Sequence, residues 1–151
     1  MTGPEFRELS AAWRQPLLEF LQALEAQGDD RWFRPHPFTA EVVDALSVHS
    51  GGDLYYVVVE GEAVLGYGML RGWSEGFEIP SLGIAIAATA RGKGIGRFFM
   101  DFLHNAARRR GSTKVRLRVH EDNLAAVTMY KSLGYEFESS EGSYLVGFFE
   151  L

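Results

Sequence analysis

Two kinds of hydrophobic spacing alternate along the chain and predict both helices and strands. In some segments apolar residues recur three and four positions apart, which is the spacing of a helix packed on one side. Other segments are short runs of β-branched, aromatic and aliphatic residues bounded by turn residues, which indicates strands. The predicted helices are residues 10–27, 39–49, 95–110 and 123–133, and the predicted strands are residues 6–9, 54–59, 63–70, 79–86, 114–119, 135–138 and 144–149.

The helix ends carry recognisable signals. Ser10 and Thr39 precede the first two helices and are of the type that accepts hydrogen bonds from the first turn. Gly111 and Gly134 follow the last two helices, where a left-handed residue commonly ends a helix. The helix over 95–110 has the strongest pattern, and its expected packing side carries Phe98, Phe99, Phe102 and Leu103.

The strands predict a mixed sheet. Residues 54–59 and 63–70 flank the tight turn Glu60-Gly61-Glu62 and should pair antiparallel. Residues 79–86 are almost wholly apolar, as in a buried central strand. Lys114 to Val119 alternates charged and apolar residues, which indicates a strand covered on one face. The order of elements predicts a single domain, residues 1–151, of the α/β or α+β class, with helices packed on a mixed sheet.

The composition fits one globular domain and removes several kinds of chemistry. The 151 residues are 46% hydrophobic, which is enough for a continuous core. The chain has no cysteine, so disulfides, thiolate metal ligands and a cysteine nucleophile are excluded. No stretch approaches the roughly 18 apolar residues that cross a bilayer, and no leader pattern begins the chain. We expect a cytoplasmic protein with no membrane partner and no bound metal.

Charge is distributed unevenly along the chain. The net charge of −5 argues against a nucleic acid as the main partner. Residues 1–90 carry 5 basic and 13 acidic groups, residues 91–120 carry 9 and 1, and residues 121–151 carry 1 and 6. Such a pattern suits a protein that holds a compact anion at one place. The alternative is that the arginines at 108–110 end a helix and those at 116 and 118 lie on a solvated strand face.

The segment Arg91-Gly92-Lys93-Gly94-Ile95-Gly96 lies between the apolar strand and the strongest helix. Unpaired N–H groups of a helix N-terminus bind phosphates, and glycines allow close approach. A Walker loop is excluded because Lys93 is followed by Gly94 rather than by serine or threonine. A dinucleotide fingerprint is excluded because the position of its third glycine holds Arg97 or Phe99. The remaining pattern is R-x-x-G-x-G after an apolar strand.

This pattern resembles the GCN5-related N-acetyltransferase (GNAT) family, over about Ile79 to Phe137. A second match lies downstream, where residues 123–135 resemble the family element N-x-x-A-x-x-[LM]-Y-x-x-x-G-[FY]. The family often has a proline two residues after the strand, where this chain has Ala88. The resemblance implies a mostly antiparallel central sheet flanked by helices.

The resemblance also implies acetyl-CoA as co-substrate. In the family the loop binds the pyrophosphate, the preceding strand lies along the pantetheine arm, and the second element closes the other side of the cofactor site. The cofactor-binding residues that this implies are Ile84, Ala85, Ile86, Arg91, Gly92, Lys93, Gly94, Ile95, Gly96 and Asn123.

The same resemblance implies a way to transfer an acetyl group. Backbone N–H groups near Ile84 to Ile86 would polarise the thioester carbonyl if this strand separates from its neighbour. Tyr130 stands at the family's general-acid position, and a phenol keeps its proton at neutral pH. The alternative role of Tyr130 is core packing alone.

The base is left open. Glu78 lies just before the apolar strand, in the region from which several family members reach the acceptor amine through water, and it is otherwise a surface glutamate. His120 is a second candidate because histidine is the residue type that exchanges protons near neutral pH, and His36 is either a rigid loop residue or part of the acceptor pocket. His49 and His104 are expected on the surface.

We expect direct transfer to a primary amine of a small molecule or amino sugar. The alternatives are a protein N-terminus or lysine as acceptor, and a module that binds acyl-CoA without turnover. Family members that acetylate ribosomal-protein N-termini have a glutamate where this chain has Arg118, which argues against that subclass. The resemblance also implies that this chain can form a homodimer, since dimers are frequent in the family.

Overall fold

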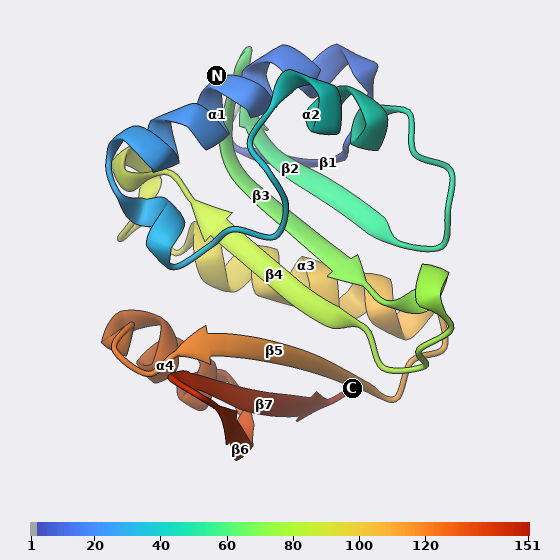
Figure 1. Ribbon diagram of the computed structural model, residues 1–151, viewed down its shortest axis with the longest axis vertical. Helices are drawn as coiled ribbons and strands as arrows, with labels where there is room; N and C mark the ends of the chain where they lie inside the picture. The colour runs from blue at the N-terminus through green and yellow to red at the C-terminus, as the bar shows by residue number, and fades with distance from the viewer. Residues whose placement is uncertain (1–2) are drawn as a thin grey trace.

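The computed structural model describes residues 3–151 and contains one seven-stranded sheet with the order β1-β2-β3-β4-β5-β7-β6. Neighbouring strands are antiparallel except β4 and β5, which are parallel. The sheet is therefore mixed and mostly antiparallel, as expected (Figure 1). The strands are β1 (Glu5–Glu8), β2 (Leu54–Glu60), β3 (Ala63–Arg71), β4 (Ser81–Ile86), β5 (Lys114–His120), β6 (Glu136–Glu141) and β7 (Tyr144–Glu150).

Helices cover both faces of this sheet. Helices α1 (Arg14–Ala26) and α2 (Ala40–Ser47) pack on one face, which we call the α1–α2 face. Helices α3 (Ile95–Arg109) and α4 (Leu124–Leu133) pack on the opposite, α3–α4 face. Figure 1 shows that α1 and α2 lie over β1–β3, whereas β5 and β7 have no helix in front of them on the α1–α2 face.

Each face has its own hydrophobic core. Leu17 and Leu21 of α1 pack with Tyr67 of β3 on the α1–α2 face. Phe99 of α3 packs on the other face so close to β3 that a Cβ at Gly68 would lie 2.6 Å from its ring. Only glycine fits there without displacing the helix, and α3 is thereby held against the sheet beside β4.

Several predicted boundaries are confirmed and others are corrected. Thr39 accepts the N–H of Val42 at 3.3 Å and caps α2, as expected. Ser10 makes no such bond, because a 3-10 turn over Ala11–Trp13 separates it from α1. Strand β6 begins at Glu136 and runs to Glu141, beyond the predicted end at 138, since the β6–β7 turn is shorter than expected.

Three predictions of burial are wrong. Strand β4 has one buried residue, Leu82, and is otherwise half-buried, because β5 separates from it. Phe98 was expected on the packing side of α3 but is 66% exposed, since it faces a groove rather than the sheet. His104 was expected on the surface but is 3% exposed.

His104 lies between α3 and the last strands because two aromatic partners hold it there. Its ring stacks on Phe149 of β7, with centroids 4.3 Å apart, and its Nε2 shares a 2.7 Å hydrogen bond with the Tyr135 hydroxyl. Burial lowers the pKa of His104 to about 4, and the neighbouring Arg108 acts in the same direction. The folded protein therefore keeps this imidazole neutral.

We expect this neutral histidine to make stability depend on pH. In the unfolded chain the imidazole takes a proton near its ordinary pKa of about 6.5, so between about pH 6.5 and 4 the unfolded state binds the extra proton. The free energy of unfolding should fall in this window as the pH falls, by at most about 1.4 kcal/mol per pH unit from this residue. Urea unfolding at pH 7, 6, 5 and 4.5 measures it.

His104→Phe is the control, since it keeps the stacking on Phe149 and cannot titrate. Its stability at pH 7 should be lower, because the Tyr135 hydroxyl loses its partner. Its decline between pH 6.5 and 4.5 should be shallower than that of the native chain. Equal slopes for the two proteins would contradict a buried neutral His104.

Candidate functional site

Strands β4 and β5 separate from each other soon after they begin. Their ladder has one bridge, between Ser81 and Arg116, and the Arg116 N–H donates to Pro80 O at 2.9 Å. By contrast, β3 pairs with β4 along its whole length, and β5 pairs with β7 along its whole length. The two halves of the sheet therefore form a split that begins after Ser81 and opens toward Ile86 and His120 (Figure 1).

The register shows which backbone groups face this split. The Ala87 N–H donates to Leu65 O of β3 at 2.7 Å. Along an antiparallel ladder such bonds alternate, so the N–H groups of Ala85 and Gly83 also point to β3. Those of Ile84 and Ile86 consequently point the other way, to β5. Since β5 is out of reach there, these donors lie along the split.

The glycine segment forms an open loop at the wide end of the split. Gly92 and Gly94 both have φ +78°, a backbone region that side chains disfavour, and nothing lies within 4 Å of a Cβ placed on Gly92. Gly94 is the N-cap of α3 and supplies no side-chain cap, and the first turn has no acidic residue. The first N–H groups of α3 are thus available to an anion.

Gly96 brings the three parts of the site together. A Cβ placed on it would meet Met129 Sδ of α4 at 3.7 Å and Ile86 Cγ1 of β4 at 3.9 Å. Arg97, one residue on, donates a hydrogen bond to Ser132 Oγ of α4. The loop, the end of β4 and the second sequence element therefore converge at this point, as the two motifs predict.

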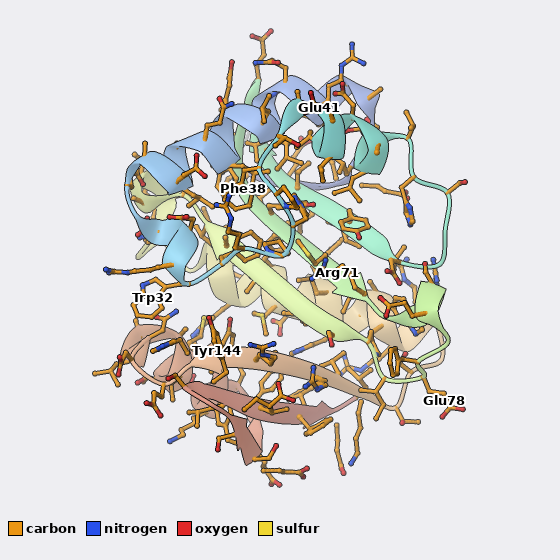
Figure 2. The ribbon with its side chains drawn as sticks, in the orientation of Figure 1. Trp32, Phe38, Glu41, Arg71, Glu78 and Tyr144 are labelled. Atoms are coloured by element: carbon orange, nitrogen blue, oxygen red, sulfur yellow. The ribbon has the colours of Figure 1, made fainter. Side chains whose placement is uncertain are left out.

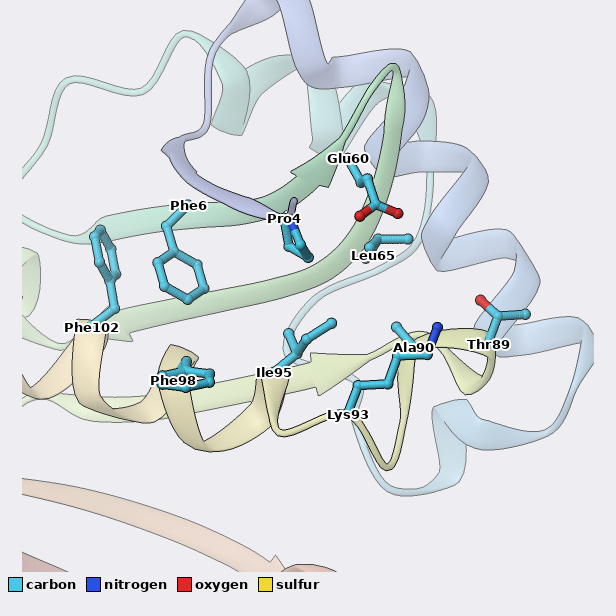
Figure 3. A pocket seen from close by; sticks show the side chains of 10 residues that line it. All are labelled: Pro4, Phe6, Glu60, Leu65, Thr89, Ala90, Lys93, Ile95, Phe98 and Phe102. Carbon is cyan, nitrogen blue, oxygen red and sulfur yellow. The ribbon is translucent and has the colours of Figure 1, made fainter. Parts of the chain in front are cut away.

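The basic residues of the loop have different surroundings. Arg91 Nε donates to Ile86 O at 3.1 Å, and its Nη2 donates to Asp29 Oδ2 at 3.0 Å, so its guanidinium fastens the end of β4 to the segment after α1. Lys93 instead lines a cavity of about 840 Å³ between α3 and the β2–β3 hairpin (Figure 3). The walls of this cavity include Phe6, Leu65 and Phe98, and no residue of β4 or β5 lines it.

Tyr130 lies in α4 next to Met129 and is 8% exposed. Its ring is 5.6 Å from that of Tyr135, and it belongs to the core on the α3–α4 face. Burial alone raises the pKa of Tyr130 to about 12. Tyr130 therefore packs in the core, and its phenol also keeps its proton at any physiological pH. Asn123 is the N-cap residue of α4 and supplies no side-chain cap.

Glu78 lies away from these groups. It is exposed, and in Figure 2 its side chain points outward beside the start of β4, at the end opposite the glycine loop. Six positions separate it from Ile84, which is about 20 Å of extended chain. The structure does not bring Glu78 into contact with Tyr130 or the loop.

The two histidines that the sequence analysis named as site candidates, His36 and His120, both make hydrogen bonds. His36 Nδ1 donates to Pro37 O at 2.8 Å, so its Nε2 accepts the Tyr67 hydroxyl at 2.9 Å, and burial lowers its pKa. His120 Nδ1 accepts the Asp122 N–H at 3.1 Å, which places the proton of the neutral ring on Nε2. His36 is thus a loop-fixing residue, whereas the His120 ring lies beside Trp32 with centroids 5.2 Å apart.

The sequence analysis missed a charged cluster on the α1–α2 face of β5. Arg116 Nη2 lies 3.2 Å from Glu141 Oε2, and Arg118 Nε lies 3.4 Å from Glu141 Oε1. The Arg118 guanidinium also lies 4.3 Å from the ring of Tyr144. Alternation in 114–119 placed both arginines on one face, but their common partner comes from β6 and could not be inferred from spacing.

Across residues 3–151, no helix combines the length and the apolar character that crossing a membrane requires.

Comparison with known proteins agrees with the fold and the motifs. The acetyltransferase (GNAT) family model matches residues 15–135. Acetyltransferase SG1711 of Sodalis glossinidius (strain morsitans) is 33% identical over 89 residues, which cover 58% of this chain and 61% of that protein's length.

Two solved structures have the same fold. The GNAT domain of S. lividans PAT superposes with a TM-score of 0.84 at 17% identity, over 98% of this chain and 90% of that one. The PaiA N-acetyltransferase of Thermoplasma acidophilum, solved in complex with coenzyme A, superposes with a TM-score of 0.76 at 16% identity, over 99% of this chain and 100% of that one. With the split between β4 and β5, the glycine loop before α3 and the family match over most of its length, the chain belongs to the GNAT family of acetyltransferases.

Proposed function

We propose that this protein transfers an acetyl group from acetyl-CoA directly to a primary amine of a small molecule or amino sugar. The observation that carries the proposal is the convergence at Gly96 of the end of β4, the uncapped first turn of α3, and α4. This convergence supports an anion site at the first turn of α3 beside the backbone donors of β4, with the protonated phenol of Tyr130 on the same helix as Met129. The GNAT family uses acetyl-CoA, and one structural neighbour was solved with coenzyme A.

The residues present fit a pyrophosphate. The N–H groups of Ile95 and Gly96 precede the first intrahelical bond of α3, which the Phe98 N–H makes to Gly94 O. Left-handed Gly92 and Gly94 keep side chains away from them, and the helix dipole favours a negative group there. Lys93 adds a full positive charge, while Arg91 holds the loop to Ile86 O.

Three groups would act on the reacting atoms. The N–H groups of Ile84 and Ile86 face the split and are placed to donate to a thioester carbonyl, which strengthens as the oxygen becomes negative. The Tyr130 hydroxyl would give its proton to the departing thiolate. Because burial raises the pKa of Tyr130 to about 12, the phenol is a weak acid, and this transfer needs close contact with the sulfur. The substrate amine must arrive neutral to attack the carbonyl carbon.

Two residues stay candidates for accepting the proton of the amine. Glu78 could act only through a chain of waters, because about 20 Å of chain separates it from Ile84. His120 is nearer the split, but its Nδ1 already accepts the Asp122 N–H, so it must exchange tautomers before Nε2 can accept a proton. The alternative acceptor of the acetyl group is a protein N-terminus or a lysine side chain. Assembly into a homodimer stays a prediction.

The first test of this function compares two isosteric substitutions at Gly94. Asn and Asp tolerate φ near +78° better than other residues with side chains, so the strain that each adds at the start of α3 should be similar. Gly94→Asp also places a negative charge where the pyrophosphate would bind. Calorimetry should give an acetyl-CoA affinity at least tenfold lower for Gly94→Asp than for Gly94→Asn. Equal affinities, with similar melting temperatures, would remove the loop from the cofactor site.

The second test separates an enzyme from a binding module. A catalytic domain should release free CoA faster when some primary amine is added, by orders of magnitude over slow hydrolysis, since positioning and polarisation both lower the barrier. A panel of amino sugars, polyamines, amino acids and peptides, followed by thiol detection, measures this. Tight acetyl-CoA binding without stimulation by any amine would instead favour the module.

The third test concerns Tyr130. Tyr130→Phe keeps the buried ring, so folding and acetyl-CoA affinity should change little, whereas turnover should fall about 100-fold or more if the thiolate loses its proton donor. Tyr135→Phe is the matched control, because it removes a neighbouring hydroxyl that is bonded to His104 and should keep turnover within a few fold. The turnover rates are compared under conditions where single-turnover and steady-state rates agree, because the chemical step then limits the rate. Undiminished turnover of Tyr130→Phe there would make Tyr130 a packing residue only.

A further inference from the structure

The α1–α2 face of β5 borders the split on the side opposite the α3–α4 helices. Val115, Leu117 and Val119 are buried on the α3–α4 face, so Arg116, Arg118 and His120 face the other way. An acceptor amine that comes from the α1–α2 face would pass these side chains before it reached the split.

The register with β4 gives their positions along the split. Ser81 is level with Arg116, so Gly83 is level with Arg118 and Ala85 with His120 as the strands diverge. A Cβ placed on Gly83 would lie 3.4 Å from Met69 Cγ and 3.6 Å from Phe33 Cε1, so Met69 and Phe33 cover β4 there. Arg118 is level with this covered stretch of β4, next in register to Ile84.

Glu141 shows which chemical group the two arginines bind. Its carboxylate accepts from Arg116 Nη2 at 3.2 Å and lies 3.4 Å from Arg118 Nε, while Arg116 Nη1 also donates to Ser81 Oγ at 3.4 Å. The closest approach of Arg118 is thus through Nε rather than through its terminal nitrogens, which form the paired donors of a guanidinium. Arg118 keeps capacity for a second carboxylate.

Glu141 itself is held loosely. It ends β6 beside the turn Gly142–Ser143, both of which are exposed, and its side chain is 52% exposed. The cluster has two guanidinium charges for one carboxylate, in a chain whose net charge is −5. An anionic ligand can therefore join the arginines or take the place of Glu141 without leaving a buried charge unpaired.

Aromatic side chains surround the same path. Trp32 lies 5.2 Å from the His120 ring, and Tyr144 lies 5.2 Å from it on the other side. Figure 2 shows Trp32 and Tyr144 in front of the region where β4 and β5 diverge. Tyr144 also fixes the Arg118 guanidinium by stacking at 4.3 Å. An apolar or aromatic group would find contacts beside the charged cluster.

We propose that Arg116 and Arg118 bind a carboxylate of the acceptor, so that the acceptor is an α-amino acid with an apolar or aromatic side chain. Glu141 occupies part of this anion site and competes with the acceptor. The proposal rests on the acetyl transfer proposed above and names its substrate class: the amine enters the split at Ile84 while the carboxylate stays on Arg118. Starting from the neutral amine, the transfer joins the amine nitrogen to the acetyl carbon and breaks the bond from that carbon to sulfur. The nitrogen loses one proton to the medium, and the thiolate takes one proton from Tyr130, which the medium then restores.

The experiment compares L-phenylalanine with L-phenylalaninamide, which differ in the carboxylate and share the ring and the α-amine. We expect kcat/KM, calculated on the concentration of the neutral amine, to be at least tenfold higher for phenylalanine when CoA release is measured at one pH. Arg118→Gln should reduce this ratio toward one, mainly through KM, because a charge-assisted pair is lost. Glu141→Gln should change the ratio in the opposite direction, since it removes the internal competitor.

Lys114→Gln is the matched control. It removes one positive charge from the same face of β5, at the end away from the split, and should leave the ratio unchanged. A ratio near one in the native chain, a preference for the amide, or an equal loss of the ratio in Lys114→Gln and Arg118→Gln would overturn the proposal. A decrease of the ratio in Glu141→Gln would assign Glu141, and not the arginines, to the acceptor.

Binding of the product separates this proposal from the proposed function. Calorimetry with N-acetyl-L-phenylalanine and N-acetyl-L-phenylalaninamide needs no turnover. If no amine stimulates CoA release but the acid binds at least tenfold more tightly than its amide, and Arg118→Gln abolishes the difference, the anion site stands and the acetyl transfer fails. If other amines are acetylated and neither the acid nor phenylalanine is preferred, the anion site fails and the acetyl transfer stands.

Discussion

The separation of β4 from β5 is the constraint on which the rest of this structure depends. A parallel ladder of six residues would normally continue, and stopping it after one bridge leaves backbone donors and acceptors without partners. Each such group costs about 1–3 kcal/mol when it is buried, so the split is tolerated only because water or a ligand reaches it. The half-buried side chains of β4 are the visible consequence. A site for an extended ligand that can pair with a strand thus comes from the topology itself.

Other contacts keep the split open from both ends. At its closed end Arg116 connects the strands through Pro80 and Ser81. At its wide end, Arg91 donates hydrogen bonds to the Ile86 carbonyl and to Asp29. The Ile86 carbonyl therefore has a hydrogen-bond donor without β5. Helices α3 and α4 both pack on the α3–α4 face and are joined by the hydrogen bond from Arg97 to Ser132. Closing the split would require all of these contacts to move together, which is why the geometry is built into the fold.

Periodicity and turn residues predicted the α-helices and the strands because these signals lie within each segment. The exceptions are positions whose surroundings come from distant segments. His104 is a polar residue that was expected on the surface, and its partners Tyr135 and Phe149 come from distant segments. Phe98 has the spacing of a core residue although no element covers it. The glycine loop and Tyr130 could be found because their motifs are local in sequence. The Arg116–Glu141–Arg118 cluster could not, since its carboxylate is contributed by the last hairpin.

The two anion sites proposed above use different donors on the two faces of the sheet. On the α3–α4 face, the proposed site uses the backbone N–H groups and the dipole of α3, which are fixed in place, together with the charge of Lys93. On the α1–α2 face, the proposed site uses flexible arginine side chains, which pair with the Glu141 carboxylate of the same chain. A rigid site suits a ligand common to every turnover, and an adjustable one suits the ligand that differs between relatives. The split therefore places an invariant backbone chemistry beside a side-chain surface that single substitutions can change.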